Sequence, residues 1–282
     1  MLLKRALTVF VFLTICTVVL ALSRYPLGSL LFLAAANLFV VTGLHEFYLL
    51  SRTKGRVSLA YGLFCGVAYC TLIFFTSPNP LTTRPLPGVT VSAGLVALLF
   101  LFFAWRVLRG DYRSVIFDFA ALTAGLVFVA WLFSFVIRIN YLPAAGDQGR
   151  WWVLSLIVIA GGADTFALLF GKAFGKRRLS PRVSPNKTVE GFVGGTVSGI
   201  ALGVGCKFLF GLGISLGQAL LLAAVISLIS HIGDLAESAL KRDAEIKDSG
   251  ALPGVGGVLD LLDSGLFAAP VMYLFMKLWL VP

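Results

Sequence analysis

The stretch that decides the fold is HIGDLAESALKRDAEIKDSGALPGVGGVLDLLDS, residues 231–264, which joins the end of one apolar run to the start of the next. It contains seven of the thirteen acidic residues, in a chain that is 59% hydrophobic and only 13% charged. Carboxylates beside runs of membrane-spanning length are costly unless they face a polar cavity, a metal ion or a partner. We therefore expect a functional site at the junction of two membrane helices.

The rest of the chain consists mostly of long apolar segments. Mean hydropathy is +0.95 over 282 residues, which is too high for a water-soluble fold, and a transmembrane helix needs about 20 mostly apolar residues. About nine segments qualify, at 6–22, 28–50, 58–76, 89–108, 115–137, 151–170, 191–211, 215–236 and 257–281. They are too long and continuous for barrel strands of about 10 alternating residues. We predict an all-α, polytopic membrane protein with about nine transmembrane helices.

The basic residues of the loops predict the orientation. With the N-terminus in the cytoplasm, seventeen Lys and Arg lie in cytoplasmic segments and four in loops on the opposite side, as the positive-inside rule requires. The net charge of +10 is mostly this topological signal. It also suits the anionic headgroups of membrane lipids and phosphate-bearing substrates. No basic segment stands apart from the membrane loops, so nothing indicates nucleic-acid binding.

The two halves of the chain differ in polarity. Residues 1–150 hold about five membrane helices with few ionisable groups inside them, and we interpret His45 and Glu46 as a satisfied interfacial pair. Residues 151–282 hold about four helices with polar loops, and we expect catalysis there. We expect the first span to stay uncleaved, because it exceeds a signal-peptide core and the loop alternation needs it. The four cysteines lie in apolar spans and predict neither a metal site nor a disulfide framework.

Polar groups ahead of the core stretch add to the site. Asp164 follows Gly161–Gly162, a pair that interrupts the sixth span and predicts a close polar contact. The next loop has six basic residues, Lys172, Lys176, Arg177, Arg178, Arg182 and Lys187. SPNKTVEG, residues 184–191, predicts a helix start with Ser184–Pro185 or Thr188 as its cap and Glu190 in its first turn. A helix N-terminus that is preceded by a lysine can bind a phosphate group. The P-loop pattern G-x-x-x-x-G-K-[ST] is absent.

The core stretch places polar residues on facing helices. At the end of the eighth span they recur at the spacing of one helix face, as Asp234, Glu237, Ser238 and Lys241. Beyond the turn LPGVGG, Asp260 and Asp263 also share a face. Three carboxylates without Cys or His favour a hard cation, so we predict that Asp234, Asp260 and Asp263 bind one or two Mg²⁺ ions. Asp243 and Glu245 fit ordinary surface salt bridges.

Three motifs carry a resemblance to one enzyme family. They are ADTFALLFGKAFGKRRLSPRVSPNKTVEG (163–191), GDLAESALKRDAEIKDSG (233–250) and LPGVGGVLDLLDS (252–264). Together they look like the phosphatidate cytidylyltransferase (CDP-diacylglycerol synthase) family, over about residues 155–270. The resemblance implies that CTP and phosphatidate give CDP-diacylglycerol and pyrophosphate, with a divalent metal, at the cytoplasmic side, in a homodimer. We therefore expect an integral, multi-pass protein of a bacterial inner membrane that serves phospholipid biosynthesis.

The resemblance also implies roles for single residues. The metal-binding acids are Asp234, Asp260 and Asp263. The catalytic residues are Asp263 and the phosphate-handling residues Lys187, Lys241 and Arg242. The substrate-binding residues are Asp164, Asn186, Glu190, Ser238 and Asp248. The chain departs from the family pattern in having Val255 where most members have His and Leu261 where they have Arg, and the segment between Asp248 and Pro253 is one residue shorter.

The chemistry agrees with this reaction and leaves alternatives open. A phosphate monoester is already an anionic nucleophile near neutral pH, so the reaction needs positioning and charge neutralisation more than a strong base. A polytopic transporter of phosphate-bearing metabolites is one alternative. A CTP transferase for another lipid phosphate, such as an isoprenoid glyceryl phosphate, is a second. A relative without activity is a third, because of Val255 and Leu261. CTP-dependent release of pyrophosphate separates a transferase from a transporter.

Overall fold

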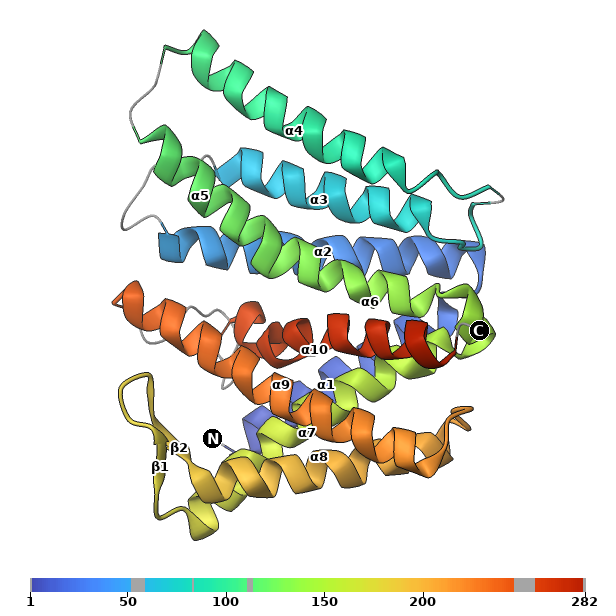
Figure 1. Cartoon of the computed structure of the whole chain (residues 1–282), viewed down its shortest axis with the longest axis vertical. Helices are drawn as coiled ribbons and strands as arrows, with labels where there is room; N and C mark the ends of the chain where they lie inside the picture. The colour runs from blue at the N-terminus through green and yellow to red at the C-terminus, as the bar shows by residue number, and fades with distance from the viewer. Residues whose placement is uncertain (1, 52–58, 83, 111–113, 246–256, 281–282) are drawn as a thin grey trace.

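The computed structural model describes residues 2–51, 59–82, 84–110, 114–245 and 257–280. Within these ranges the chain is a bundle of helices with one small β-hairpin (Figure 1). The first half contains α1 (Leu2–Leu22), α2 (Pro26–Ser51), α3 (Leu59–Thr76), α4 (Val89–Leu108), α5 (Val115–Gly125), the π-helical turn η1 (Leu126–Trp131) and α6 (Leu132–Asn140). The second half contains η2 (Pro143–Gln148), α7 (Gly149–Phe174), β1 (Arg178–Ser180), β2 (Ser184–Thr188), α8 (Val189–Leu209), α9 (Leu216–Asp243) and α10 (Val258–Trp279).

The predicted spans correspond to helices within the described residues. The fifth span is the continuous helix made by α5, η1 and α6, and each of the others falls on one α-helix. Eight of the described helical segments are long and apolar enough to cross a membrane, and α1 contributes a shorter apolar segment, Phe10–Leu22. The prediction of an all-α, polytopic membrane protein is confirmed, with the β-hairpin as an addition that the sequence analysis did not foresee.

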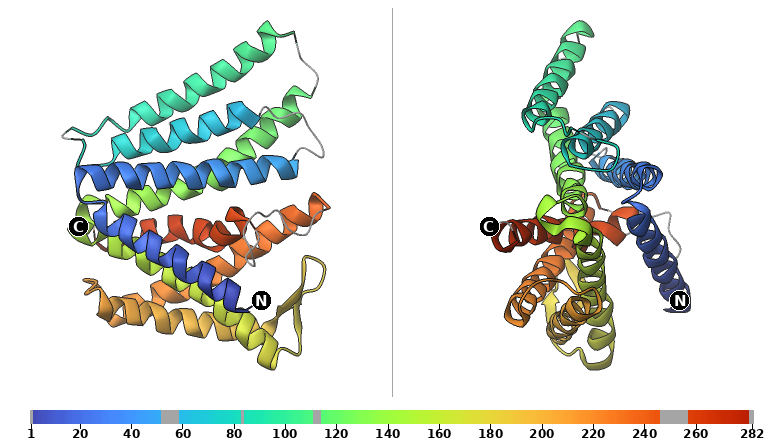
Figure 2. Two further views of the ribbon diagram at one scale, coloured as in Figure 1. Left: turned by 180° about the vertical axis from the view of Figure 1, so that it is seen from behind. Right: turned by 90° about the vertical axis from the view of Figure 1, so that its right-hand side faces the viewer.

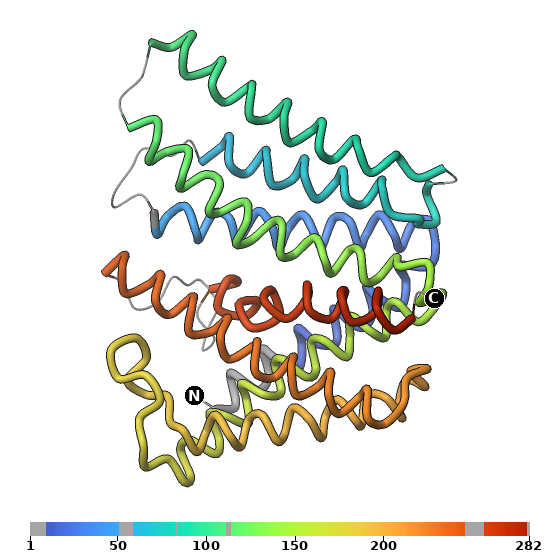
Figure 3. Tube along the Cα trace, in the orientation of Figure 1, coloured from blue at the N-terminus to red at the C-terminus, as the bar shows by residue number. Residues whose placement is uncertain are grey.

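Helix α10 packs against helices of both halves of the chain. In Figure 1, α4 is outermost, followed by α3 and α2, and Figure 2 shows α1 running alongside α7. α10 packs against α9 and α7 of the second half and against α6 and α2 of the first. The ends of α2, α4 and α9 lie with the hairpin at one end of the bundle, on the left of Figures 1 and 3. The sequence assigns its most basic loops to this end.

Helix α8 packs closely because it presents glycine to its neighbours. Its buried glycines recur at every fourth position, as Gly191, Gly195, Gly199 and Gly203. A Cβ atom on Gly195 would lie 2.5 Å from the carbonyl oxygen of Ala163 in α7, and one on Gly203 would lie 2.4 Å from Cβ of Ala223 in α9. Small residues at such positions allow membrane helices to approach backbone to backbone. Helices α7, α8 and α9 are therefore held in a fixed arrangement.

The sixth span is not interrupted. α7 runs as one helix from Gly149 to Phe174, through Gly161–Gly162 and Asp164, so the predicted interruption is wrong. A side chain from α8 uses the space at Gly162 instead, since a Cβ atom there would lie 2.2 Å from Cδ1 of Leu202. The glycine admits a neighbouring side chain while the helix continues.

The β-hairpin leads directly into α8. β1 and β2 pair antiparallel, with Arg178 opposite Thr188. Thr188 is the cap of α8, because its hydroxyl oxygen accepts a hydrogen bond from the Gly191 amide at 3.1 Å. Ser184–Pro185, the other candidate cap, lies in β2. The predicted helix start is therefore correct with Thr188 as its cap.

Glu190 joins the segment before the hairpin to the first turn of α8. Its carboxylate accepts hydrogen bonds from the backbone amides of Lys176, at 3.0 Å, and Arg177, at 3.2 Å. A carboxylate in this first turn also interacts favourably with the helix dipole. Glu190 therefore fixes both ends of the hairpin, and this positions Lys187 of β2.

Candidate active site

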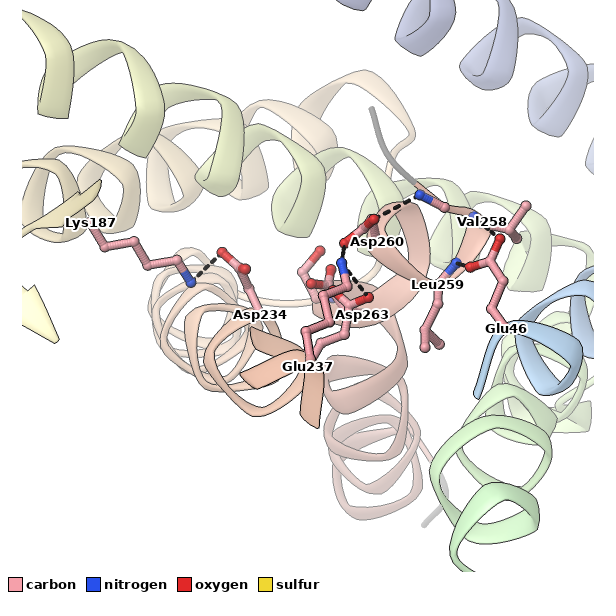
Figure 4. A network of polar contacts seen from close by, with 11 residues as sticks. Glu46, Lys187, Asp234, Glu237, Val258, Leu259, Asp260 and Asp263 are labelled. Carbon is pink, nitrogen blue, oxygen red and sulfur yellow. Dashed lines mark hydrogen bonds and ion pairs between the residues drawn. The ribbon is translucent and has the colours of Figure 1, made fainter. Parts of the chain in front are cut away.

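Acidic and basic side chains of α9 and α10 meet at the hairpin end of the bundle. Lys241 of α9 forms ion pairs with Glu237, one turn earlier at 3.1 Å, and with Asp260 of α10. Asp263 of α10 is only 4% exposed, and its carboxylate lies near that of Glu237. Figure 4 shows the side chains of Glu237, Asp260 and Asp263 converging between the two helices. The structure thus brings together the acids that the sequence placed on two separate helix faces.

The hairpin contributes a lysine beside this cluster. Lys187 at the end of β2 forms an ion pair with Asp234 of α9 (Figure 4). Asp234 lies close enough to Asp263 for their charges to interact. The predicted phosphate residue Arg242 is exposed, and its Nε donates a hydrogen bond to the Val183 carbonyl at 3.1 Å. Two contacts therefore hold the hairpin against α9.

The first turn of α10 is capped by a carboxylate from the other half of the chain. Glu46 of α2 accepts hydrogen bonds from the backbone amides of Val258, at 2.9 Å, and Leu259, at 2.8 Å (Figure 4). Asp260 reaches back to the Gly257 amide at 2.7 Å. Helix N-termini leave four amides without intrahelical partners, and these two acids satisfy three amides at this terminus. The placement of Asp260 and Asp263 thus depends on a residue of α2.

Two cavities of different character meet at Asp164. The first, the polar cavity, has a volume of about 470 Å³, and its lining includes Lys172, Asn186, Lys187, His231 and Asp234 as well as apolar side chains. The second has a volume of about 370 Å³ and a mostly apolar lining from α1, α2, α6, α7 and α10. Asp164 lines both cavities, and Asp260 and Leu261 also line the apolar one. The site can therefore hold a charged ligand next to an apolar one.

The residues around Asp263 suit a hard cation in their chemistry. The described residues contain no ready-made group of three or more His, Cys, Asp or Glu for a metal, and Lys187 and Lys241 pair with the predicted ligands Asp234 and Asp260. However, Asp164, Asp234 and Glu237 all bring negative charge close to Asp263. Mg²⁺ commonly takes one or two carboxylates together with water and substrate phosphates. An oxygen donor set with this much negative charge fits such an ion.

Some predicted residues do not join the cluster. Glu190 and Arg242 make backbone contacts in and around the hairpin. Ser238 is half-buried on α9, and no side chain among the described residues is seen to bind it. Asp248 lies outside the described residues, as does Val255, the first residue that differs from the family pattern. The second residue that differs from this pattern, Leu261, faces the apolar cavity.

Three residues that the structure places at the site were not predicted from the sequence. Glu237 was part of the polar stripe on α9, and its burial at 2% exposure marks it as central. His231 precedes Asp234 by one helical turn, so the same periodicity would have found it. Glu46 was interpreted as part of an interfacial pair with His45. No local signal links Glu46 to α10, because their contact spans more than two hundred residues.

The fold and site together define a class: a polytopic membrane enzyme whose charged site lies at the helix ends and adjoins an apolar cavity. A profile of the cytidylyltransferase family matches residues 3–279. The chain therefore belongs to the cytidylyltransferase family and is a nucleotidyltransferase, and the resemblance seen in the motifs is confirmed.

Curated relatives from bacteria agree with this membership. The chain is 31% identical to a phosphatidate cytidylyltransferase of Synechocystis sp., over 93% of this chain and 94% of the relative. It is 28% identical to that of Staphylococcus aureus, over 88% and 91%. A 32% identity to the Bacillus subtilis phosphatidate cytidylyltransferase covers 56% of this chain and 58% of that protein.

Proposed function

We propose that the protein transfers the cytidylyl group of CTP to phosphatidate, forming CDP-diacylglycerol and pyrophosphate for phospholipid biosynthesis. The observation that carries this proposal is the meeting of a polar and an apolar cavity at Asp164. A nucleotide needs the first environment and a lipid the second, and their phosphates must meet at the boundary. The relatives from Synechocystis and Staphylococcus aureus bear the name of this activity.

The reaction requires two polyanions to approach in line. An oxygen of the lipid phosphate attacks the α-phosphorus of CTP, and the bond from this phosphorus to the oxygen that bridges to the β-phosphate breaks. Pyrophosphate leaves with the electron pair of that bond. Lys187 lines the polar cavity, and we assign it to neutralise phosphate oxygens there. We assign Asn186, on the same strand and lining the same cavity, to hydrogen-bond the nucleotide. Positioning and neutralisation of this kind carry most of the catalysis in phosphoryl-type transfer.

Lys241 has a different role from Lys187 in this proposal. It lies between Glu237 and Asp260 and holds both carboxylates in place. We assign Asp234, Asp260 and Asp263 to the binding of one or two Mg²⁺ ions. Bound there, such an ion would stabilise negative charge on the attacking and leaving oxygens.

The side of the membrane and the assembly belong to the same proposal. We propose that the polar cavity faces the cytoplasm of a bacterial inner membrane. The basic loops at that end of the bundle support this orientation, and the relatives are bacterial. We also propose a homodimer, as the family resemblance implies. Light scattering of the protein in detergent would test the homodimer, because a monomeric mass would refute it.

Incorporation of radiolabelled CTP into lipid by the purified protein tests the activity. We expect Lys187→Ala and Asp263→Ala each to lower the rate by at least about 10²-fold, as for removal of one electrostatic stabiliser. The matched control is Lys207→Ala, because Lys207 lies in the last turn of α8 with its ammonium over the Phe208 ring. A chelator should abolish turnover, and added Mg²⁺ should restore it. Near-full activity in either site variant would refute its assignment.

A CTP transferase for a different lipid phosphate is the second candidate. Leu261 favours it, because this residue lines the apolar cavity at a position where the resemblance predicts Arg. A panel of lipid phosphates assayed with the same protein would decide between them. A protein that binds CTP but never turns over any lipid phosphate would be an inactive relative. Absence of CTP-dependent pyrophosphate release with transport of a phosphorylated solute would indicate a transporter.

A further inference from the structure

Three helices hold the imidazole ring of His231 in one orientation. His231 lies on α9 and is 5% exposed. Its Nδ1 is 3.5 Å from an Asp164 oxygen of α7, and its ring lies against Phe192 of α8, with centroids 4.8 Å apart. An acid on one ring nitrogen fixes which nitrogen is presented on the other side. The contact with Asp164 therefore directs Nε2 away from α7.

The other ring nitrogen has no partner among the described residues. Nε2 of His231 is buried and unpaired, although the residue lines the polar cavity beside Lys187 and Asp234. Buried polar atoms in folded proteins nearly always have a partner. An unpaired ring nitrogen in the wall of a cavity therefore points to a group supplied by a ligand.

The surrounding groups indicate the chemistry of that ligand. Of the two acids that line the polar cavity, Asp234 is paired with Lys187, and Asp164 faces His231. The side chains of Lys172 and Asn186 add further hydrogen-bond donors to the lining. A phosphate dianion accepts hydrogen bonds and donates none, so its partner on the ring would be an N–H group at Nε2.

We propose that His231 is a further substrate-binding residue, oriented by Asp164, whose Nε2 donates a hydrogen bond to a phosphate oxygen of the substrates. This inference rests on the proposed function and extends it. It gives Asp164, the residue at the boundary of the two cavities, a positioning role through the imidazole. The phosphate belongs either to the nucleotide or to the lipid, and the two sources share this chemistry.

The test compares His231→Leu with His231→Gln, whose amide keeps an N–H donor. Binding of inorganic pyrophosphate is measured by calorimetry in detergent, and KM is measured separately for CTP and for phosphatidate. Loss of one charge-assisted hydrogen bond should weaken binding by about 10- to 150-fold in His231→Leu. His231→Gln should recover part of that loss. His45→Leu is the matched control, because His45 is the other histidine of the chain and is exposed on α2.

The measurements distinguish a nucleotide phosphate from a lipid phosphate, and they test the role of His231 separately from the proposed transfer reaction. A rise in the pyrophosphate Kd and the CTP KM supports the nucleotide phosphates, whereas a rise in the phosphatidate KM alone supports the lipid phosphate. Unchanged values in His231→Leu and His231→Gln, or losses equal to those in His45→Leu, would overturn the inference. A wild-type protein that does not bind pyrophosphate, with an unchanged phosphatidate KM in the variants, would also overturn it. Pyrophosphate binding needs no turnover, so it tests His231 even if the proposed transfer reaction fails.

Discussion

Glu46 is the clearest case in which a residue of the first half supports the site in the second. It is 8% exposed and accepts the backbone amides of Val258 and Leu259 at 2.9 and 2.8 Å. Gly257, at the cap position, has no side chain to do this. We expect Glu46→Ala to loosen the first turn of α10, and therefore to displace the carboxylates that follow in that turn and the next.

The size of the effect follows from where the two amides lie. The Leu259 amide is buried, and leaving it unpaired costs about 1–3 kcal/mol. The Val258 amide is only partly buried, so water can replace its lost partner, at about 0.5–1.5 kcal/mol. Together these losses should destabilise the first turn by about 1.5–4.5 kcal/mol. Glu46→Gln should lose less, because its amide keeps one acceptor oxygen.

Hydrogen exchange followed by mass spectrometry is the direct assay. In Glu46→Ala, the peptide from Gly257 to Asp263 should exchange about 10- to 2,000-fold faster where local opening controls exchange. CTP incorporation should fall in parallel, by as much as about 10²-fold, because misplaced catalytic groups are inefficient. His45→Ala, its exposed neighbour on α2, should change neither measurement. Wild-type exchange of this peptide in Glu46→Ala would refute the capping role.

Two further predictions concern the hairpin and the glycine face of α8. Arg242→Lys keeps the charge but loses the Nε contact to the Val183 carbonyl, so activity should fall by about 2- to 12-fold, the worth of one hydrogen bond. Full activity in the Arg242→Lys assay would instead favour a charge role. Gly195→Ala should lower the unfolding temperature in detergent, because overpacking against Ala163 costs about 1–3 kcal/mol. Gly205→Ala, on the same helix in open space, should leave stability equal or slightly higher, and equal losses at both glycines would contradict the packing argument.

The helices were predictable because one physical requirement dominates them. Lipid offers no hydrogen-bond partners to the backbone, so a long apolar run must be helical, and this rule located every span. It said nothing of the β-hairpin, whose Ser, Pro, Asn and Lys residues carry no strand signal. It also did not tell whether Gly161–Gly162 would break α7. Glycine permits either a break in a helix or a close contact with a neighbouring helix. In the structure, Gly162 makes a close contact with Leu202 of α8.

The acids of the site were predictable as a set, but their partners were not. Helical spacing put Asp260 and Asp263 on one face of α10, and a face is a local property. Which cation meets which carboxylate depends on how α9, α10 and the hairpin pack. The sequence could not show that Lys241 would pair with Asp260, or Lys187 with Asp234.

These pairings bear directly on catalysis. Asp164, Asp234, Glu237, Asp260 and Asp263 gather at the site, and among the described residues only Lys187 and Lys241 form ion pairs with them, apart from His231 beside Asp164. Both proposed substrates add further negative charge, and like charges repel strongly in a partly desolvated site. We therefore propose that additional cations accompany the nucleotide. A cluster built only to stabilise the fold would balance its own charge, so the excess of carboxylates argues for a site that is completed by its ligands.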